Sequence, residues 1–132
     1  MPSVTHRADQ FYELTHEPTR IRVADRVAPA RGWVGRGLGL IGRAELSAGE
    51  GLWLTHTSAV HTLGMRFPID LLFLDDDGRT AGVARHVAPN RLYCGRRGAH
   101  AVIELAAGSL EKVPVITRED RWLLEPSGRH TS

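Results

Sequence analysis

The stretch from Ile69 to Leu74 constrains the fold of this chain more than any other, because every residue in it except Asp70 is strongly apolar. A strand with one solvated face alternates apolar and polar residues, whereas a continuously apolar strand needs cover on both faces. The run Asp75-Asp76-Asp77-Gly78 follows at once. Since an Asp-Gly pair supplies the positive φ that a hairpin turn needs, we expect a buried strand that turns at Gly78 into a partner over 79–87.

Other short apolar segments, separated by turn residues, predict a mainly β fold. Fourteen glycines and seven prolines divide the 132 residues, a pattern typical of strands and turns. Further strands are expected over 19–23, 51–55, 101–105 and 121–125, with a core that includes Ile69, Leu71, Phe73, Leu74 and Val102. One or two short helices are expected, a turn at 108–112 and a segment at 30–43, where a glycine-rich loop is the alternative.

The length of the chain fits one domain, residues 1–132, with an ordered core over about 15–125 and mobile polar ends at 1–10 and 126–132. No apolar run approaches the ~18 to 20 residues that span a bilayer. The N-terminus shows no signal-peptide pattern. We therefore expect no membrane partner and a cytoplasmic location. Cys94 is the only cysteine, which excludes an internal disulfide and a zinc site made of several thiolates.

The charge pattern gives no support to nucleic-acid binding. The net charge is +2, and the basic residues, nearly all arginine, are scattered rather than interleaved with aromatic residues. Gly37 to Gly42 matches a dinucleotide fingerprint in form, but neither a buried strand before it nor an acidic residue about twenty positions later is present. In an EF-hand alignment the aspartate run puts Phe73 and Ala84 where carboxylates are required. We therefore expect no metal, no cofactor and no nucleic acid.

Polar groups stand directly before and inside the apolar segments. A buried carboxylate must pair with a cation or accept several hydrogen bonds, because leaving it unpaired is costly. Gathering such groups at the open end of the buried strand is the economical arrangement. The sequence thus predicts a cleft that binds a small molecule or a peptide segment, lined by His61, Met65, Arg66, Asp70, Arg91 and Glu104.

Two other interpretations stay open. A hydrolase could use His61 with Asp70 or Glu104, their pKa values driven apart as general acid and base. Alternatively, the same residues could only lock the fold of a structural or interaction protein. The sequence carries no signal for the oligomeric state.

Several motifs in order resemble the domain-of-unknown-function family 192. They span roughly residues 28–120 and comprise 39–43, 49–52, 60–62, 65–70 with 73–75, Pro89 with Arg91, and 104–108. The resemblance implies a compact single-domain β-sandwich of jelly-roll type and no established activity. Where many relatives look to have a cysteine, this chain has Thr57, which puts a thiol role there in doubt. Asn90 stands where many have a tryptophan, and Glu119-Asp120 where they often have Gly-Asp.

Overall fold

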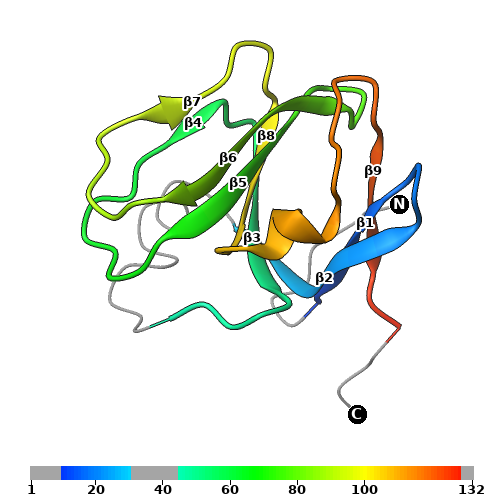
Figure 1. Ribbon diagram of the computed structural model, residues 1–132, viewed down its shortest axis with the longest axis horizontal. Coiled ribbons are helices and arrows are strands. Elements are labelled where there is room, and N and C mark those ends of the chain that lie inside the picture. The colour runs from blue at the N-terminus through cyan, green and yellow to red at the C-terminus, as the bar shows by residue number, and fades with distance from the viewer. Residues whose placement is uncertain (1–9, 31–44, 129–132) are drawn as a thin grey trace.

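The fold is built almost entirely from β-strands (Figure 1). The computed structural model describes residues 10–30 and 45–128, and every structural statement below concerns these residues. They form β1 (Tyr12–His16), β2 (Ile21–Ala30), β3 (Glu50–Thr55), β4 (Ala59–Val60), β5 (Ile69–Leu74), β6 (Thr80–Val87), β7 (Cys94–Gly95), β8 (Ala101–Ala106), the 3₁₀-helix η1 (Ser109–Lys112) and β9 (Trp122–Pro126).

Seven strands make one sheet in the order β6-β5-β8-β3-β2-β1-β9. β2 and β3 run parallel, and all other neighbours in this sheet run antiparallel. The sheet curls into a half-barrel. The short strands β4 and β7 pair with each other in a second sheet. The predicted mainly β fold is therefore confirmed.

β5 is covered on both faces, as its continuous apolar sequence predicts, and all six of its residues are buried. Its alternate side chains enter two apolar clusters. The Met65 cluster consists of Leu46, Met65, Ile69, Leu71, Phe73, Ala81, Val87, Ala99, Val102 and Ala106. The Leu14 cluster consists of Tyr12, Leu14, Val23, Ala24, Val27, Leu72, Leu74, Ile103, Leu105, Leu110, Val113 and Trp122. The predicted core residues are thus confirmed.

The hairpin between β5 and β6 turns at the predicted glycine. Gly78 has a φ of 79°. Its N–H donates to the carbonyl of Asp75 at 3.1 Å, and the N–H of Asp75 donates to the carbonyl of Arg79 at 2.9 Å. These bonds close the turn, so the role assigned to the Asp-Gly pair is confirmed.

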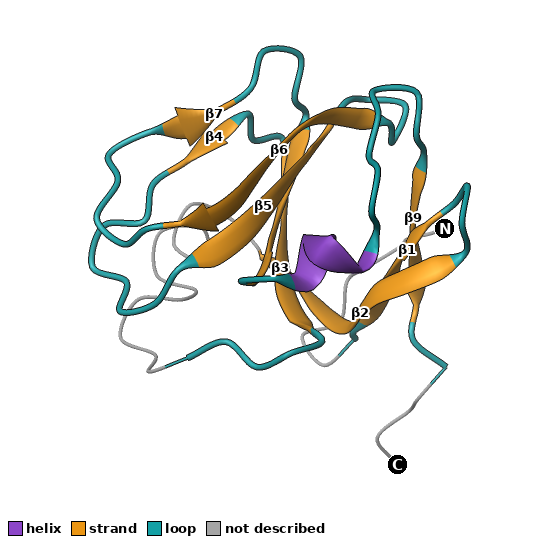
Figure 2. Ribbon diagram, in the orientation of Figure 1, coloured by secondary structure: helices purple, strands orange, loops and turns teal. Residues whose placement is uncertain are grey.

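The helical turn expected at 108–112 is η1, shown in purple in Figure 2. Gly108 precedes it with a φ of 93°, and Leu110 and Val113 pack into the Leu14 cluster. The helix or loop expected at 30–43 falls outside the described residues except for Ala30, which ends β2. No helix in the described part of the chain has the length and apolar character required to cross a bilayer.

The N-terminal hairpin differs from the expectation. β1 was not predicted, although its burial alternates, with Tyr12, Leu14 and His16 inside. The strand expected over 19–23 begins instead at Ile21 and continues to Ala30. The residues before it form the turn that joins β1 to β2, in which Arg20 has a φ of 62° and donates its N–H to the carbonyl of His16 at 2.8 Å.

Candidate functional site

Asp70 lies inside β5, with no exposed surface, and accepts three backbone hydrogen bonds. Its Oδ1 accepts the N–H of His86 at 2.9 Å, and its Oδ2 accepts the N–H groups of Gly108 and Leu110 at 3.0 Å each. The carboxylate thereby ties β5 to the end of β6 and to the start of η1. Three N–H donors satisfy a buried carboxylate without any cation. Asp70 is therefore a structural clamp in this fold.

A β-bulge in β6 makes this clamp possible. Ile69 pairs with Val87 and Leu71 pairs with Ala84, so two residues of β6 lie opposite Asp70 alone. His86, one of those two, has a φ of 51°. Such a bulge frees a backbone N–H from the ladder and redirects it. Here the freed N–H of His86 is the one that Asp70 accepts.

Thr62 fixes the loop that follows β6 in a similar way. Its buried hydroxyl donates to the carbonyl of Ala88 and accepts the N–H of Arg91, both at 2.8 Å. Its backbone carbonyl accepts the N–H of Asn90 at 2.8 Å, and its own N–H donates to the carbonyl of Arg91 at 2.9 Å. Two buried polar side chains of the 61–70 segment, Thr62 and Asp70, thus hold residues 86–91 in place.

The structure brings together only part of the predicted cleft. Met65 is buried in the cluster named after it, whereas the side chains of His61, Arg66 and Arg91 are exposed. The ring of His61 accepts the N–H of Leu63 at its Nδ1, at 3.1 Å. The expectation of one common cleft needs correction at Asp70, because this residue pairs with Leu105 of the Leu14 cluster, while Glu104 pairs with Leu71 of the Met65 cluster. Paired residues share a face, so the two carboxylates point to opposite sides of the sheet.

Glu104 faces the side of the described sheet that carries the Met65 cluster, here called the Met65 face. Its neighbours across the strands are Leu52 on β3 and Leu71 on β5. Only 5% of the residue is exposed. Burial raises the pKa of its carboxyl group from 4.5 to about 7, because desolvation disfavours the charged form. Near neutral pH this carboxyl group is therefore protonated in some molecules and ionised in others.

No hydrogen bond reaches the Glu104 carboxyl group from any described residue, in contrast to the three that reach Asp70. No side-chain nitrogen or oxygen in the described ranges is both fully enclosed and without a partner. At least part of the small exposed surface of Glu104 therefore belongs to its carboxyl oxygens, which reach solvent there. A buried carboxyl group with a strongly raised pKa is a candidate functional group.

A cavity of about 400 Å³ opens next to the end of β8, between residues of the Met65 cluster and η1. Ala106, a member of the Met65 cluster, and Phe67, which packs against that cluster, both line this cavity. Ala106 follows Glu104 by two positions on β8, about 7 Å along the strand. The full lining is Glu45, Leu46, Ala48, Phe67, Pro68, Ala106, Ala107, Gly108, Ser109 and Lys112.

Arg96 adds a cation to the Met65 face that the sequence did not reveal. Its guanidinium carbon lies 5.2 Å from the centre of the Phe73 ring. Nη1 donates to the carbonyl of Gly95 and Nη2 to the carbonyl of Val83, both at 2.8 Å. A Cβ on Gly82 would lie 2.7 Å from Cγ and Cδ of Arg96, so the glycine makes room for this side chain. Nothing in the local sequence marks the contact, because Gly82 and Arg96 meet only in the folded sheet.

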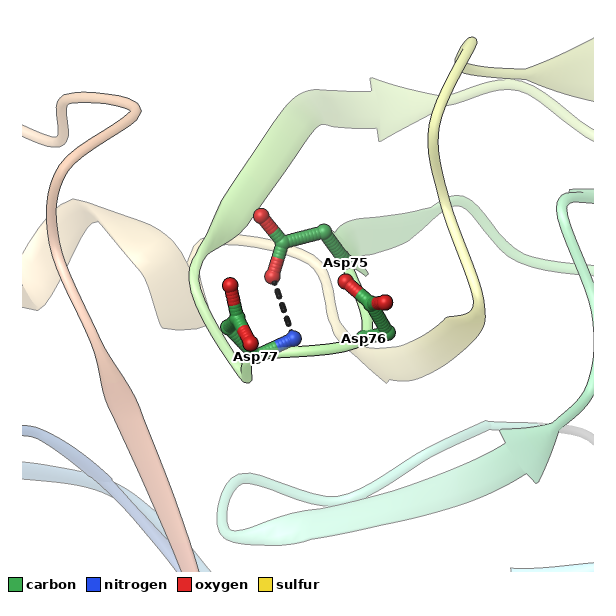
Figure 3. Close-up of side chains that lie close together, drawn as sticks. All are labelled: Asp75, Asp76 and Asp77. Atoms are coloured by element: carbon green, nitrogen blue, oxygen red, sulfur yellow. Dashed lines mark hydrogen bonds between the residues drawn. The ribbon is translucent and has the colours of Figure 1, made fainter.

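The aspartates at the β5–β6 turn form a third polar group, with carboxylate oxygens within 4.8 Å of one another (Figure 3). Oδ1 of Asp75 accepts the N–H groups of Asp77 and Arg79, both at 2.9 Å. Asp76 and Asp77 are exposed. We assign Asp75 to the stability of the turn, since its side chain replaces backbone acceptors there.

Two solved structures share this fold. A protein from Sinorhizobium meliloti 1021, provisionally called a transcription regulator, is 19% identical, with a TM-score of 0.75 over 93% of this chain and 98% of that chain. A protein of unknown function from Novosphingobium aromaticivorans DSM 12444 is 21% identical, with a TM-score of 0.72 over 85% of this chain and 82% of that chain. At these identities the likeness establishes the fold alone. No curated protein matches the chain.

The sequence itself matches a family over most of its length. The match is to DUF192, described as an uncharacterized ACR, and it covers residues 14–120. This range contains β5, β8 and both carboxylates discussed above. The chain therefore belongs to the domain-of-unknown-function family 192.

Proposed function

We propose that this protein is a small binding module, and that its Met65 face holds a polar ligand or a peptide segment through Glu104. The observation that carries the proposal is the carboxyl group of Glu104, a residue that is only 5% exposed. The pKa of this group is raised to about 7, and it receives no hydrogen bond from the described residues. Burying such a group without a partner costs free energy of folding. A ligand that supplies the missing partner recovers that cost on binding.

The chemistry of the face indicates the kind of ligand. An amine, amidine or amide N–H would donate to Glu104, and an ammonium group would bind its carboxylate form and lower its pKa again. Leu52 and Leu71 on either side offer apolar contact for the body of the ligand. Ligand sites are commonly apolar cavities with a few oriented polar groups. We therefore expect a ligand that joins an N–H donor to an apolar part.

The geometry gives less support to a hydrolase. The oxygens of Asp70 accept three backbone N–H groups and no hydrogen bond from the ring of His61, so this carboxylate does not orient that histidine. Nδ1 of His61 is engaged with Leu63. A histidine base in a hydrolase normally needs an acid that orients its ring and a nucleophile within reach. The purely structural alternative explains Asp70 and Thr62 but leaves no role for Glu104.

A thermal-shift screen of the full chain tests the proposal, with aliphatic amines, amino-acid amides, short peptides and divalent metals as probes. A ligand that binds only the folded state raises the melting temperature. We expect N–H donors to stabilise the wild type and to lose this effect in Glu104→Gln, whose shape is nearly unchanged. Glu125→Gln, at an exposed position on β9, is the matched control and should keep the effect. Equal shifts in Glu104→Gln and the wild type would refute the proposal.

A further inference from the structure

A second cavity, of about 300 Å³, lies between the end of β6 and the loop that leads into β7. Its lining contains three basic residues and no acidic one among the described residues: Ala84, Arg85, His86, Val87, Arg91, Tyr93 and Cys94. Arg91, which the sequence assigned to the cleft around Asp70, belongs here instead. The chemistry of this cavity is therefore opposite to that of Glu104.

Two of the three basic groups have no counter-ion in the described part of the chain. His86 is paired, because its Nε2 lies 2.9 Å from Oε2 of Glu111. Arg85 and Arg91 make no ion pair with any described carboxylate. They come from different segments, β6 and the loop after it, yet both line one cavity. An anion placed between two such guanidinium groups relieves their mutual repulsion and can bind in a bidentate manner.

The backbone that carries these arginines is held rigidly. Asp70 accepts the N–H of His86, next to Arg85, and Thr62 binds both the N–H and the carbonyl of Arg91. His86 and Asn90 both adopt left-handed backbone conformations, with φ of 51° and 65°. Non-glycine residues persist in this region only where the surroundings enforce it. Fixed walls reduce the ordering cost of binding a small ligand.

We propose that the Arg85–Arg91 cavity is a binding site for a small phosphate-bearing molecule. The guanidinium groups of Arg85 and Arg91 bind the phosphate oxygens. The largely exposed ring of Tyr93 flanks the cavity and contacts the remainder of the ligand. Because Glu104 lies two strands away across Leu71 and Ala84, about 10 Å in the sheet, this site does not depend on the amine site proposed above.

Isothermal titration calorimetry with pyrophosphate and with inorganic phosphate tests this site on the full chain. We expect saturable binding at one site per chain, weakened at least about tenfold by Arg85→Gln and by Arg91→Gln, since each loses a charge-assisted hydrogen bond. Arg118→Gln removes the same charge from an exposed position outside the cavity and should bind as the wild type does. Glu104→Gln should also bind normally, which separates this proposal from the first.

Cys94 supplies a second readout, because it is the only thiol in the chain and lines the cavity. Pyrophosphate should slow its alkylation by iodoacetamide in the wild type and in Arg118→Gln, but not in Arg85→Gln or Arg91→Gln. Either of two results would overturn the proposal: no binding of either probe, or a loss of binding in Arg118→Gln equal to that in Arg85→Gln and Arg91→Gln. Circular dichroism of each variant ensures that a loss of binding reflects the site and not unfolding.

Discussion

Asp70 on β5 and Glu104 on β8 lie one position apart in the register of two paired strands, yet they point to opposite faces of the sheet. The first is satisfied by three backbone N–H groups and the second by none from the described residues. Two acidic residues that look equivalent in the sequence, each inside an apolar strand, therefore have different tasks. Asp70 stabilises the fold, and the carboxyl group of Glu104 is available to the ligand that we propose.

Asp70→Ala should destabilise the protein severely. The substitution leaves three N–H groups without their acceptor, at about 1 to 3 kcal/mol for each that stays buried and unpaired, so we expect a loss of at least about 3 kcal/mol in the free energy of unfolding. Asp77→Ala, on the exposed part of the β5–β6 turn, is the control and should stay within about 0.5 kcal/mol of the wild type. Urea unfolding measures both. A loss below about 1 kcal/mol for Asp70→Ala would show that its hydrogen bonds are dispensable.

Glu104 should make stability fall as the pH rises from 5 to 8. Its pKa is about 7 in the folded protein and 4.5 as the ordinary value, so between these values the folded state keeps a proton that the unfolded state has lost. The free energy of unfolding then decreases with pH, by roughly 3 kcal/mol in total for this group. Glu104→Gln should remove the decrease, being more stable than the wild type at pH 8 and close to it at pH 5.

Urea unfolding at the two pH values checks this difference, with Glu125→Gln as a control that keeps the wild-type slope. Parallel pH profiles for the wild type and Glu104→Gln would contradict the raised pKa. Because the comparison is between variants, the contributions of the other titrating groups cancel.

Phe73→Ala should cost about 3 to 5 kcal/mol, since it opens a cavity in the Met65 cluster. The ring also carries the guanidinium of Arg96 on its face. Leu92→Ala, at a residue that is 78% exposed, provides a comparison and should change stability little. Chemical denaturation is the measurement. A cost for Phe73→Ala under about 1 kcal/mol would place this ring outside the core.

Gly82→Ala should be more destabilising while Arg96 is present than in its absence. The new Cβ would lie 2.7 Å from Cγ and Cδ of Arg96 and would displace the side chain from the carbonyl of Val83. In an Arg96→Ala background the same change should cost less, giving a coupling free energy of about 1 kcal/mol. A double-mutant cycle by urea unfolding measures this value. Additive effects would mean that the glycine serves another purpose.

The sequence predicts a strand well where apolar residues fill it from end to end. The continuous apolar run of β5 indicated a strand covered on both faces, and the Asp-Gly pair indicated its turn. The sequence could not predict which face of the sheet each carboxylate points to, because β5 and β8 carry apolar residues on both faces. Whether Asp70 and Glu104 point to the same face or to opposite faces depends on the register between β5 and β8, and that register is a property of the folded sheet.

Residues that meet only through tertiary structure were missed for the same reason. Arg96 reaches Val83 across the sheet edge, and Arg91 lines a cavity with Arg85 because Thr62 and Asp70 hold the intervening backbone. The sequence identified the polar groups of 61–70 as unusual for a buried segment. Their main partners turned out to be backbone groups of 86–91 and 108–110, and no sequence spacing marks those contacts.

β6 lies at one end of the described sheet. At its start the N–H of Thr80 already donates to the carbonyl of Asp120 at 3.0 Å, and the outer edge further along the strand is where another molecule would pair. Exposed edges of this kind promote aggregation unless a charge or an occupied hydrogen-bonding group interrupts them. Arg96 does both, since its guanidinium donates to the carbonyl of Val83 in the middle of β6. The side chain that completes the Met65 face therefore also protects the protein against edge-to-edge association, and its loss should show first in solubility at high concentration.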